Sequence, residues 1–141
     1  MARVDLLVMG CNTFDQVATF DPWPYGDKPV VALSHRPLEM PEHLPGRVSH
    51  ASETPVTLLA RLSSEGVRRV YVDGGTTIRC FLADGLIDDL TITLIPRLLG
   101  IGRPLFGPLA GDVHLQLLGS KNHDFGFVQL DYRAVKATPP A

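Results

Sequence analysis

The fold of this chain is decided by residues 67–85, VRRVYVDGGTTIRCFLADG. Val67 and residues 70–72 form a short apolar, β-branched run, which is typical of a buried strand in a parallel sheet. The run stops at Asp73, and a helix can begin after two glycines with Thr76 or Thr77 as its cap. A strand, two glycines and a helix start therefore follow one another directly, as in a βα unit of an α/β domain.

This strand-to-helix turn is a candidate anion-binding site. Gly74 and Gly75 allow the backbone to approach a ligand closely, and the first N–H groups of the helix would point at that ligand. The positive end of the helix dipole favours an anion such as a phosphate. The alternative is a tight turn that binds nothing, and two glycines alone do not decide between these interpretations.

A second turn of the same kind lies earlier in the chain. Residues 4–9 form a nearly continuous apolar run, which is followed by Gly10, Cys11, Asn12 and Thr13. Asn12 or Thr13 would cap a short helix, and this start again leaves backbone N–H groups free at the end of a strand.

A third candidate turn follows the predicted strand of residues 29–33. Ser34, His35 and Arg36 place hydroxyl and cationic donors at one point, and a guanidinium can bind a phosphate monoester through two hydrogen bonds. The alternative is a solvated loop arginine. In the loop before this strand, residues 23–26 contain two aromatic side chains that are either a lid or packing residues.

The remaining pattern completes a layered α/β domain. A helix is predicted to start at Thr54-Pro55 and to end at Gly66, and further strands are predicted at residues 47–51, 88–96, 113–118 and 127–132. We therefore expect one domain over residues 1–135, with a mostly parallel central sheet flanked by helices, a C-terminal antiparallel hairpin and a disordered tail, residues 136–141. Ligands of such sheets bind beyond the carboxyl ends of the strands, so the three turns together predict a ligand with several phosphates.

Composition narrows the possible partners. The chain has 13 basic and 15 acidic residues, a formal net charge of −2, and no run of either sign, so neither nucleic acid nor an anionic membrane is expected as a partner. No apolar run approaches the roughly 18 residues that a membrane span needs. The N-terminus lacks the layout of a secretion signal, and two widely separated cysteines fit the cytoplasm. The histidines and cysteines show no metal-ligand spacing, so no metal is expected.

Four segments carry a family resemblance: MGCNTFDQV (residues 9–17), VALSHR (31–36), VYVDGGTTI (70–78) and LIDDLTITLIPRLLGIGRPLF (86–106). In this order they resemble the dihydrofolate reductase superfamily. Within it they are most similar to the bacterial branch that contains the C-terminal domain of RibD, the bifunctional riboflavin-pathway enzyme. The resemblance covers the chain to about Val135. It implies a dihydrofolate-reductase-like fold and an NADPH-dependent reductase of a pyrimidine or a pterin.

The resemblance also implies roles for individual residues. Those expected to bind the cofactor are Gly10, Cys11, Asn12, Thr13, Ser34, His35, Arg36, Gly74, Gly75, Thr76 and Thr77. Among them, residues 34–36 would lie near the adenosine 2′-phosphate and residues 74–77 would wrap the pyrophosphate. Gln16, Val17 and Asp73 are expected on the substrate side. Neither Asp73 nor Asp15, which is expected to be an acidic residue of the first helical turn, is assigned as a proton donor.

The chain departs from the family pattern in two ways. The family often has an arginine at the position of Cys11, so one charge for the 2′-phosphate is absent and the preference for NADPH over NADH is left open. The family pattern also begins earlier, with a strand in the middle of the sheet, so the edges of the strands at residues 4–9 and 67–72 are expected to be unpaired. A neighbouring chain can fill that gap, the two strands can close up, or the chain is truncated.

Three functions fit these observations. The first is the reductase, the second is a nucleotide-binding module without catalysis, and the third is a structural dimer whose turns bind nothing. Unpaired apolar strand edges predict self-association, as a homodimer, in all three cases.

Overall fold

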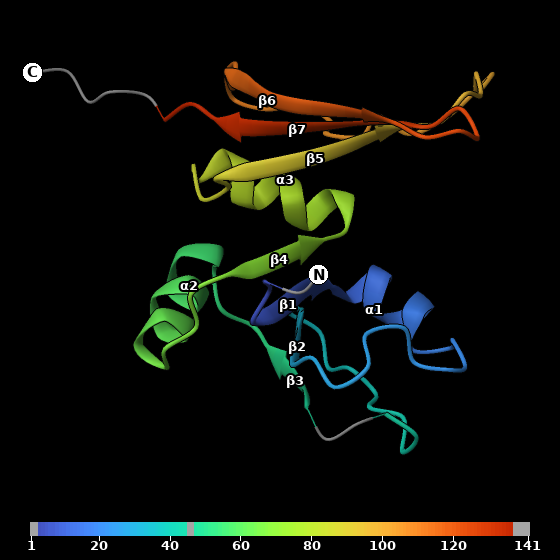
Figure 1. Cartoon of the computed structure of the whole chain (residues 1–141). Helices are drawn as coiled ribbons and strands as arrows, with labels where there is room; N and C mark the ends of the chain where they lie inside the picture. The colour runs from blue at the N-terminus through green and yellow to red at the C-terminus, as the bar shows by residue number, and fades with distance from the viewer. Residues whose placement is uncertain (1–2, 45–46, 137–141) are drawn as a thin grey trace, which may run out of the picture. The chain divides into compact units, whose positions relative to one another are not determined.

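The structure is a computed structural model, and it describes residues 3–44 and 47–136. The chain divides into two compact units, Met1–Cys80 and Phe81–Ala141, which are described separately below (Figure 1). The predicted disordered tail lies, beyond Lys136, outside the described residues. The expectation of one domain over residues 1–135 stays a prediction.

The first unit is built on a parallel sheet (Figure 1). Its strands are β1 (Leu6–Gly10), β2 (Val30–Leu33), β3 (Val48–Ala51) and β4 (Val70–Asp73). Their order across the sheet is β3-β2-β1-β4, and every neighbouring pair is parallel. The carboxyl ends of the strands therefore lie at one edge, as the α/β prediction requires.

The pairing of β1 with β4 bears on the alternatives that the sequence left open for these two strands. The two strands pair directly, from Leu6 with Val70 to Met9 with Asp73, and β1 has β2 on its other side. This matches the alternative, left open by the sequence, in which the strands at residues 4–9 and 67–72 close up on each other, and β1 therefore has no unpaired edge. Among the described residues, the edge strands of this sheet are β3 and β4.

Three helices follow strands in the chain: α1 (Cys11–Val17), α2 (Pro55–Ser64) and α3 (Gly75–Ala83). The start of α2 is as predicted, because the Thr54 side chain accepts a hydrogen bond from the Thr57 N–H and Pro55 opens the helix.

The predicted caps of the other two helices were wrong. Helix α1 has Gly10 at its N-cap with no side-chain cap, and α3 begins at Gly75 directly after Gly74, whose φ is 93°. Both helices start at the glycines themselves, so the Asn, Thr and Cys side chains that follow lie inside the first turn.

The core of the first unit surrounds β1. Leu7 and Met9 are fully buried on one face, and their neighbours Leu6 and Val8 are buried on the other. This burial on both faces explains the continuous apolar run in the sequence. The cluster around Leu7 and Met9 also contains Phe14, Val17, Ala18, Val30 and Ala32, with Trp23, Tyr25, Leu38, Leu44 and Val48 packed against it.

The second unit contains an antiparallel sheet. Its strands are β5 (Asp89–Leu94), β6 (Leu115–Asn122) and β7 (Val128–Ala134), in the order β5-β7-β6. The predicted C-terminal hairpin is thus confirmed, and β5 pairs with it along its whole length. The predicted α/β fold class is confirmed, with the antiparallel strands gathered in a sheet of their own. None of the helices in residues 3–44 and 47–136 is long and apolar enough to cross a membrane.

Candidate functional site

The first two predicted turns meet at the carboxyl edge of the parallel sheet. Because β1 and β4 pair in register, Gly10 and Gly74 start their turns side by side. A Cβ atom built on Gly10 would lie 2.5 Å from Thr77 Oγ1, and a Cβ atom built on Gly74 would lie 2.6 Å from Thr13 Oγ1. Each turn therefore places its glycine against the threonine of the other turn.

These contacts explain why both positions hold glycine. Gly10 has an ordinary extended backbone, with φ −76°, so the space taken by the Thr77 hydroxyl is the reason at this position. Gly74 has a φ of 93° as well as a crowded Cβ position, so any side chain there would be strained twice. Residues 10–13 and 74–77, hereafter the two glycine turns, approach more closely than side chains would allow.

The second glycine turn presents free hydrogen-bond donors. Helix α3 begins in this turn, and its backbone N–H groups at Gly75, Thr76 and Thr77 have no hydrogen-bond partner in the part of the chain that the structure describes. The first intrahelical bond of α3 is donated by the Ile78 N–H to the Gly74 carbonyl, at 2.9 Å. Three N–H groups at the positive end of a helix can bind an anion.

The third turn is held by its own serine. The buried Ser34 hydroxyl accepts a hydrogen bond from the Arg36 N–H at 3.1 Å, and the Ser34 N–H donates to the Ala51 carbonyl at 2.8 Å. The His50 Nε2 lies 2.9 Å from the Ser34 carbonyl oxygen. Ser34 therefore fixes the backbone from which the Arg36 side chain extends.

Arg36 is paired with a carboxylate from another element. Its guanidinium forms an ion pair with Asp15 of α1, and both side chains are about half exposed, at 50% and 51%. The hydrogen bond from Arg36 to Asp15 raises the pKa of the guanidinium. Asp15 was predicted as an acidic residue of the first helical turn, but it lies beyond the first turn of α1. Its pairing with Arg36 was not predicted, because nothing in the local pattern indicates a partner so distant in the chain.

A second polar pair lies at the end of β4. The Tyr25 hydroxyl donates to Asp73 Oδ2 at 3.2 Å, and Asp73 Oδ1 accepts the Gly74 N–H at 2.7 Å. Burial, followed by the nearby Asp73 carboxylate, raises the pKa of Tyr25 to about 12. The Tyr25 ring also packs edge-on against Trp23, with centroids 5.3 Å apart. From the sequence, Tyr25 was expected to be either a lid or a packing residue. In the structure it packs against the core of the first unit and also donates a hydrogen bond to Asp73.

The other predicted residues are dispersed. Asn12, Gln16 and His35 are exposed, and Cys11 is partly buried at the start of α1. Val17 is buried in the core of the first unit, so only Gln16 of the predicted substrate-side pair on α1 reaches the surface.

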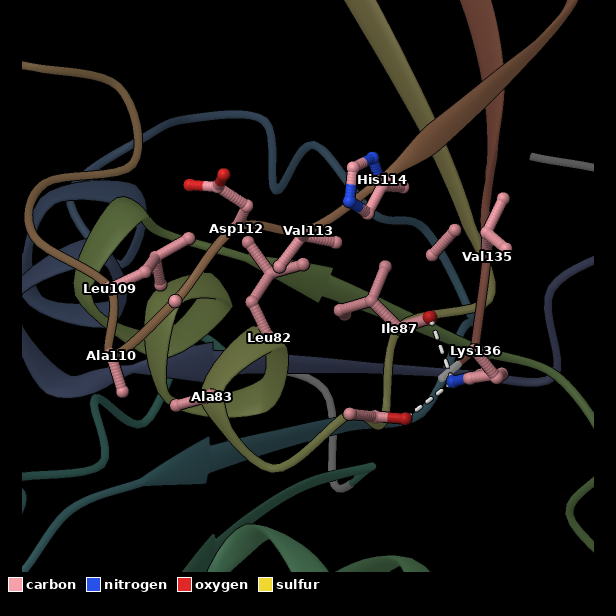
Figure 2. Close-up of a pocket in the computed structure, with 13 residues that line it drawn as sticks. Leu82, Ala83, Ile87, Leu109, Ala110, Asp112, Val113, His114, Val135 and Lys136 are labelled. Atoms are coloured by element: carbon pink, nitrogen blue, oxygen red, sulfur yellow. Dashed lines mark hydrogen bonds between the residues drawn. The ribbon is translucent and has the colours of Figure 1, made fainter. Parts of the chain in front are cut away.

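The second unit contains a pocket of about 370 Å³ that involves none of the predicted site residues (Figure 2). Apolar side chains such as Leu82 and Val113 line it. Lys136 lies at its wall, where the ammonium donates to the Gly85 carbonyl and, at 3.0 Å, to the Ile87 carbonyl. The ammonium group of Lys136 is therefore hydrogen-bonded to the segment that follows α3.

Metal ligands were not expected from the sequence. Within residues 3–44 and 47–136, no group of three or more His, Cys, Asp or Glu side chains is placed to hold a metal ion.

Comparison with known proteins points to one family. A family model described as the RibD C-terminal domain matches residues 26–128. The Bacillus subtilis protein YwjB is 33% identical over 132 residues, which are 92% of this chain and 73% of that protein.

Solved structures show the same fold. A crystal structure of a protein from Shewanella sp. PV-4 that is named for riboflavin biosynthesis superposes with a TM-score of 0.88 at 40% identity. The match covers 96% of this chain and 76% of that one. Acinetobacter baumannii RibD gives a TM-score of 0.76 at 21% identity, over 96% of this chain and 48% of that one, and this likeness concerns the fold alone.

Proposed function

The chain belongs to the RibD C-terminal domain family, and we propose that it is an NADPH-dependent reductase that transfers a hydride to a small heterocycle. One observation carries the proposal. The two glycine turns approach too closely for side chains, and one of them presents three free N–H groups at the start of α3. Backbone arranged in this way is suited to the phosphates of a dinucleotide.

The residues present fit such a cofactor. In this proposal the N–H groups of Gly75, Thr76 and Thr77 bind the pyrophosphate, and residues 10–13 contact it from the other turn. The absence of a Cβ atom at Gly10 and Gly74 lets the two turns pack against each other, because the Thr77 and Thr13 hydroxyls take those positions.

Arg36 is the cation proposed for the adenosine 2′-phosphate. Its backbone is fixed by the Ser34 hydroxyl, and its half-exposed guanidinium can be reached from solvent. A guanidinium suits a phosphate monoester because it offers paired donors in one plane. His35, also exposed, lies next to it in the same turn.

When bound, the cofactor supplies the hydride, and the chain's task is to bind, orient and exclude water. On the substrate side we place Gln16 and Asp73. The Asp73 carboxylate accepts hydrogen bonds from Tyr25 and Gly74, and it has acceptor capacity left for an N–H group of a heterocycle. In this proposal Asp73 orients the substrate and is not the proton donor.

The proposed substrate is a pyrimidine or a dihydrofolate-like pterin. One structural relative, from Thermotoga maritima, carries the name 5-amino-6-(5-phosphoribosylamino)uracil reductase, and that pyrimidine is the first compound to test. A cytoplasmic location belongs to the same proposal, because Cys11 and Cys80 are both free thiols, as is usual in a reducing compartment.

The test is hydride transfer from NADPH labelled with deuterium at the transferred position. The account predicts that the full chain oxidises NADPH in the presence of one of these heterocycles and that the deuterium appears in the product. Gly74→Ala, if it remains folded, should lose most of this transfer, while Gly66→Ala should retain it. Saturable NADPH binding with no transfer to either substrate class would instead favour the nucleotide-binding module without catalysis.

A further inference from the structure

The ion pair between Arg36 and Asp15 bears on which dinucleotide the chain prefers. Arg36 follows β2, whereas Asp15 belongs to α1, the helix that begins in the first glycine turn. The pair therefore joins the third predicted turn to the first, at the carboxyl edge of the sheet.

The two partners differ in how firmly they are held. The backbone of Arg36 is tied to Ser34, a buried residue whose own N–H is bonded to β3. The guanidinium is half exposed, and so is the Asp15 carboxylate, which makes no other hydrogen bond in the described part of the chain. A ligand approaching from solvent thus meets a cation and an anion together.

These two charges act oppositely on the two forms of the cofactor. A 2′-phosphate must compete with Asp15 for the guanidinium and is repelled by the carboxylate. A 2′-hydroxyl can donate to the same carboxylate, which is how acidic residues bind the ribose of unphosphorylated dinucleotides in other α/β sheets. The pair weakens the advantage that Arg36 alone would give to the phosphorylated form.

We propose that Asp15 is a specificity-determining residue, which holds Arg36 and lowers the preference of the site for a 2′-phosphorylated dinucleotide over its unphosphorylated form. This inference rests on the proposed function. It concerns the choice between two cofactors and is independent of the substrate.

The test measures the binding of two adenosine phosphates and requires no enzymatic activity. Dissociation constants for adenosine 2′,5′-bisphosphate and for adenosine 5′-monophosphate are measured by calorimetry on the full chain and on Asp15→Asn. Removing one negative charge at contact distance is expected to tighten binding of the bisphosphate about three- to tenfold, with binding of the monophosphate unchanged or weaker. The same measurement with NADPH and NADH should shift their ratio in the same direction.

Asp27→Asn is the matched control. It removes the same charge from an exposed aspartate that precedes β2, whereas Arg36 follows that strand, so its effect on the ratio should be less than twofold. Asp15→Ser repeats the test with a side chain that cannot mimic the carboxylate, and circular dichroism checks that each variant is folded.

The outcomes separate this inference from the proposed function. If the parent chain binds NADPH or NADH and neither Asp15 variant changes the ratio, the inference is wrong and the proposed function stands. If the parent chain binds neither dinucleotide and neither adenosine phosphate, both are wrong.

Discussion

Gly74 faces Thr13 so closely that a Cβ atom on the glycine would lie 2.6 Å from the threonine Oγ1. The two residues belong to different turns, which β1 and β4 bring together at the edge of the parallel sheet. The reciprocal contact, between Gly10 and Thr77, packs the same two turns against each other a second time. The two glycine turns therefore stabilise each other, and they also form the surface that we propose for the cofactor.

Gly74→Ala should destabilise the chain and abolish cofactor binding. The left-handed backbone and the overpacking against Thr13 together are expected to cost about 2–4 kcal/mol of unfolding free energy. Urea unfolding measures the loss of stability. A dinucleotide titration under conditions where the variant is still folded measures the loss of binding.

Gly66→Ala is the control for backbone strain. Gly66 has a similar φ of 88°, but a Cβ atom there would meet nothing within 4 Å. We expect a loss of only about 1–2 kcal/mol, with binding unchanged. Equal losses of stability in the two variants would show that the crowding against Thr13 has no energetic effect.

The Gly10–Thr77 contact can be tested with a double-mutant cycle. Gly10→Ala adds a methyl group where the Thr77 hydroxyl lies, at a backbone conformation that alanine adopts freely. It should cost about 1–3 kcal/mol in the parent chain and clearly less in a Thr77→Ala background, because the second substitution removes the crowding atom. Thermal unfolding of the four proteins gives the coupling energy, and additive effects would contradict the close approach.

Tyr25 should make stability depend on alkaline pH. Its pKa is raised to about 12 in the folded chain from an ordinary value of 10, so the folded state favours the protonated hydroxyl. This contribution is complete below pH 10 and is lost as the pH rises through about 12. Tyr25→Phe should also remove about 0.5–1.5 kcal/mol at neutral pH by deleting the hydrogen bond to Asp73.

The measurement is the difference in unfolding free energy between the parent chain and Tyr25→Phe at several alkaline pH values. This difference should shrink between pH 10 and 12. Tyr71, whose pKa is also raised by burial and by Asp73, contributes to both proteins and cancels in the comparison. A difference that stays constant over this range would mean that Tyr25 does not titrate as described.

Self-association stays a prediction. The sequence placed the unpaired strand edge partly on β1, whereas the structure leaves other strands at the sheet edges. β1 is paired on both sides, whereas β6 is an edge strand whose Leu115, Leu117 and Leu118 are exposed. Apolar side chains on an unpaired edge favour burial against a second copy. Sedimentation velocity at micromolar concentration should therefore show a dimer, and Leu117→Lys should shift it toward monomer. A parent chain that sediments as a monomer would contradict this.

Local patterns predicted most of the fold. Apolar runs, glycines and the Thr54-Pro55 start mark their elements within a few residues, so the strands, α2 and the C-terminal hairpin were found. The predicted caps of α1 and α3 failed because each helix starts directly after a glycine, Gly10 or Gly74, and therefore earlier than a capping side chain would start it.

Pairings between distant residues could not be predicted. Asp15 with Arg36 and Tyr25 with Asp73 join parts of the chain that are 21 and 48 residues apart, and neither spacing follows a helical or strand period. Val17 is a different case, because the family resemblance implied a place on the substrate side, whereas the structure buries the side chain in the core cluster.

A titration of the full chain with NADPH, followed by the fluorescence of Trp23 and repeated with NADH, tests the central claim most directly. The account predicts saturable binding with a dissociation constant below about 1 mM, and loss of that binding in folded Gly74→Ala but not in Gly66→Ala. A folded parent chain that binds neither dinucleotide, or a Gly74→Ala variant that binds as tightly as the parent, would contradict the assignment of the two glycine turns to the cofactor.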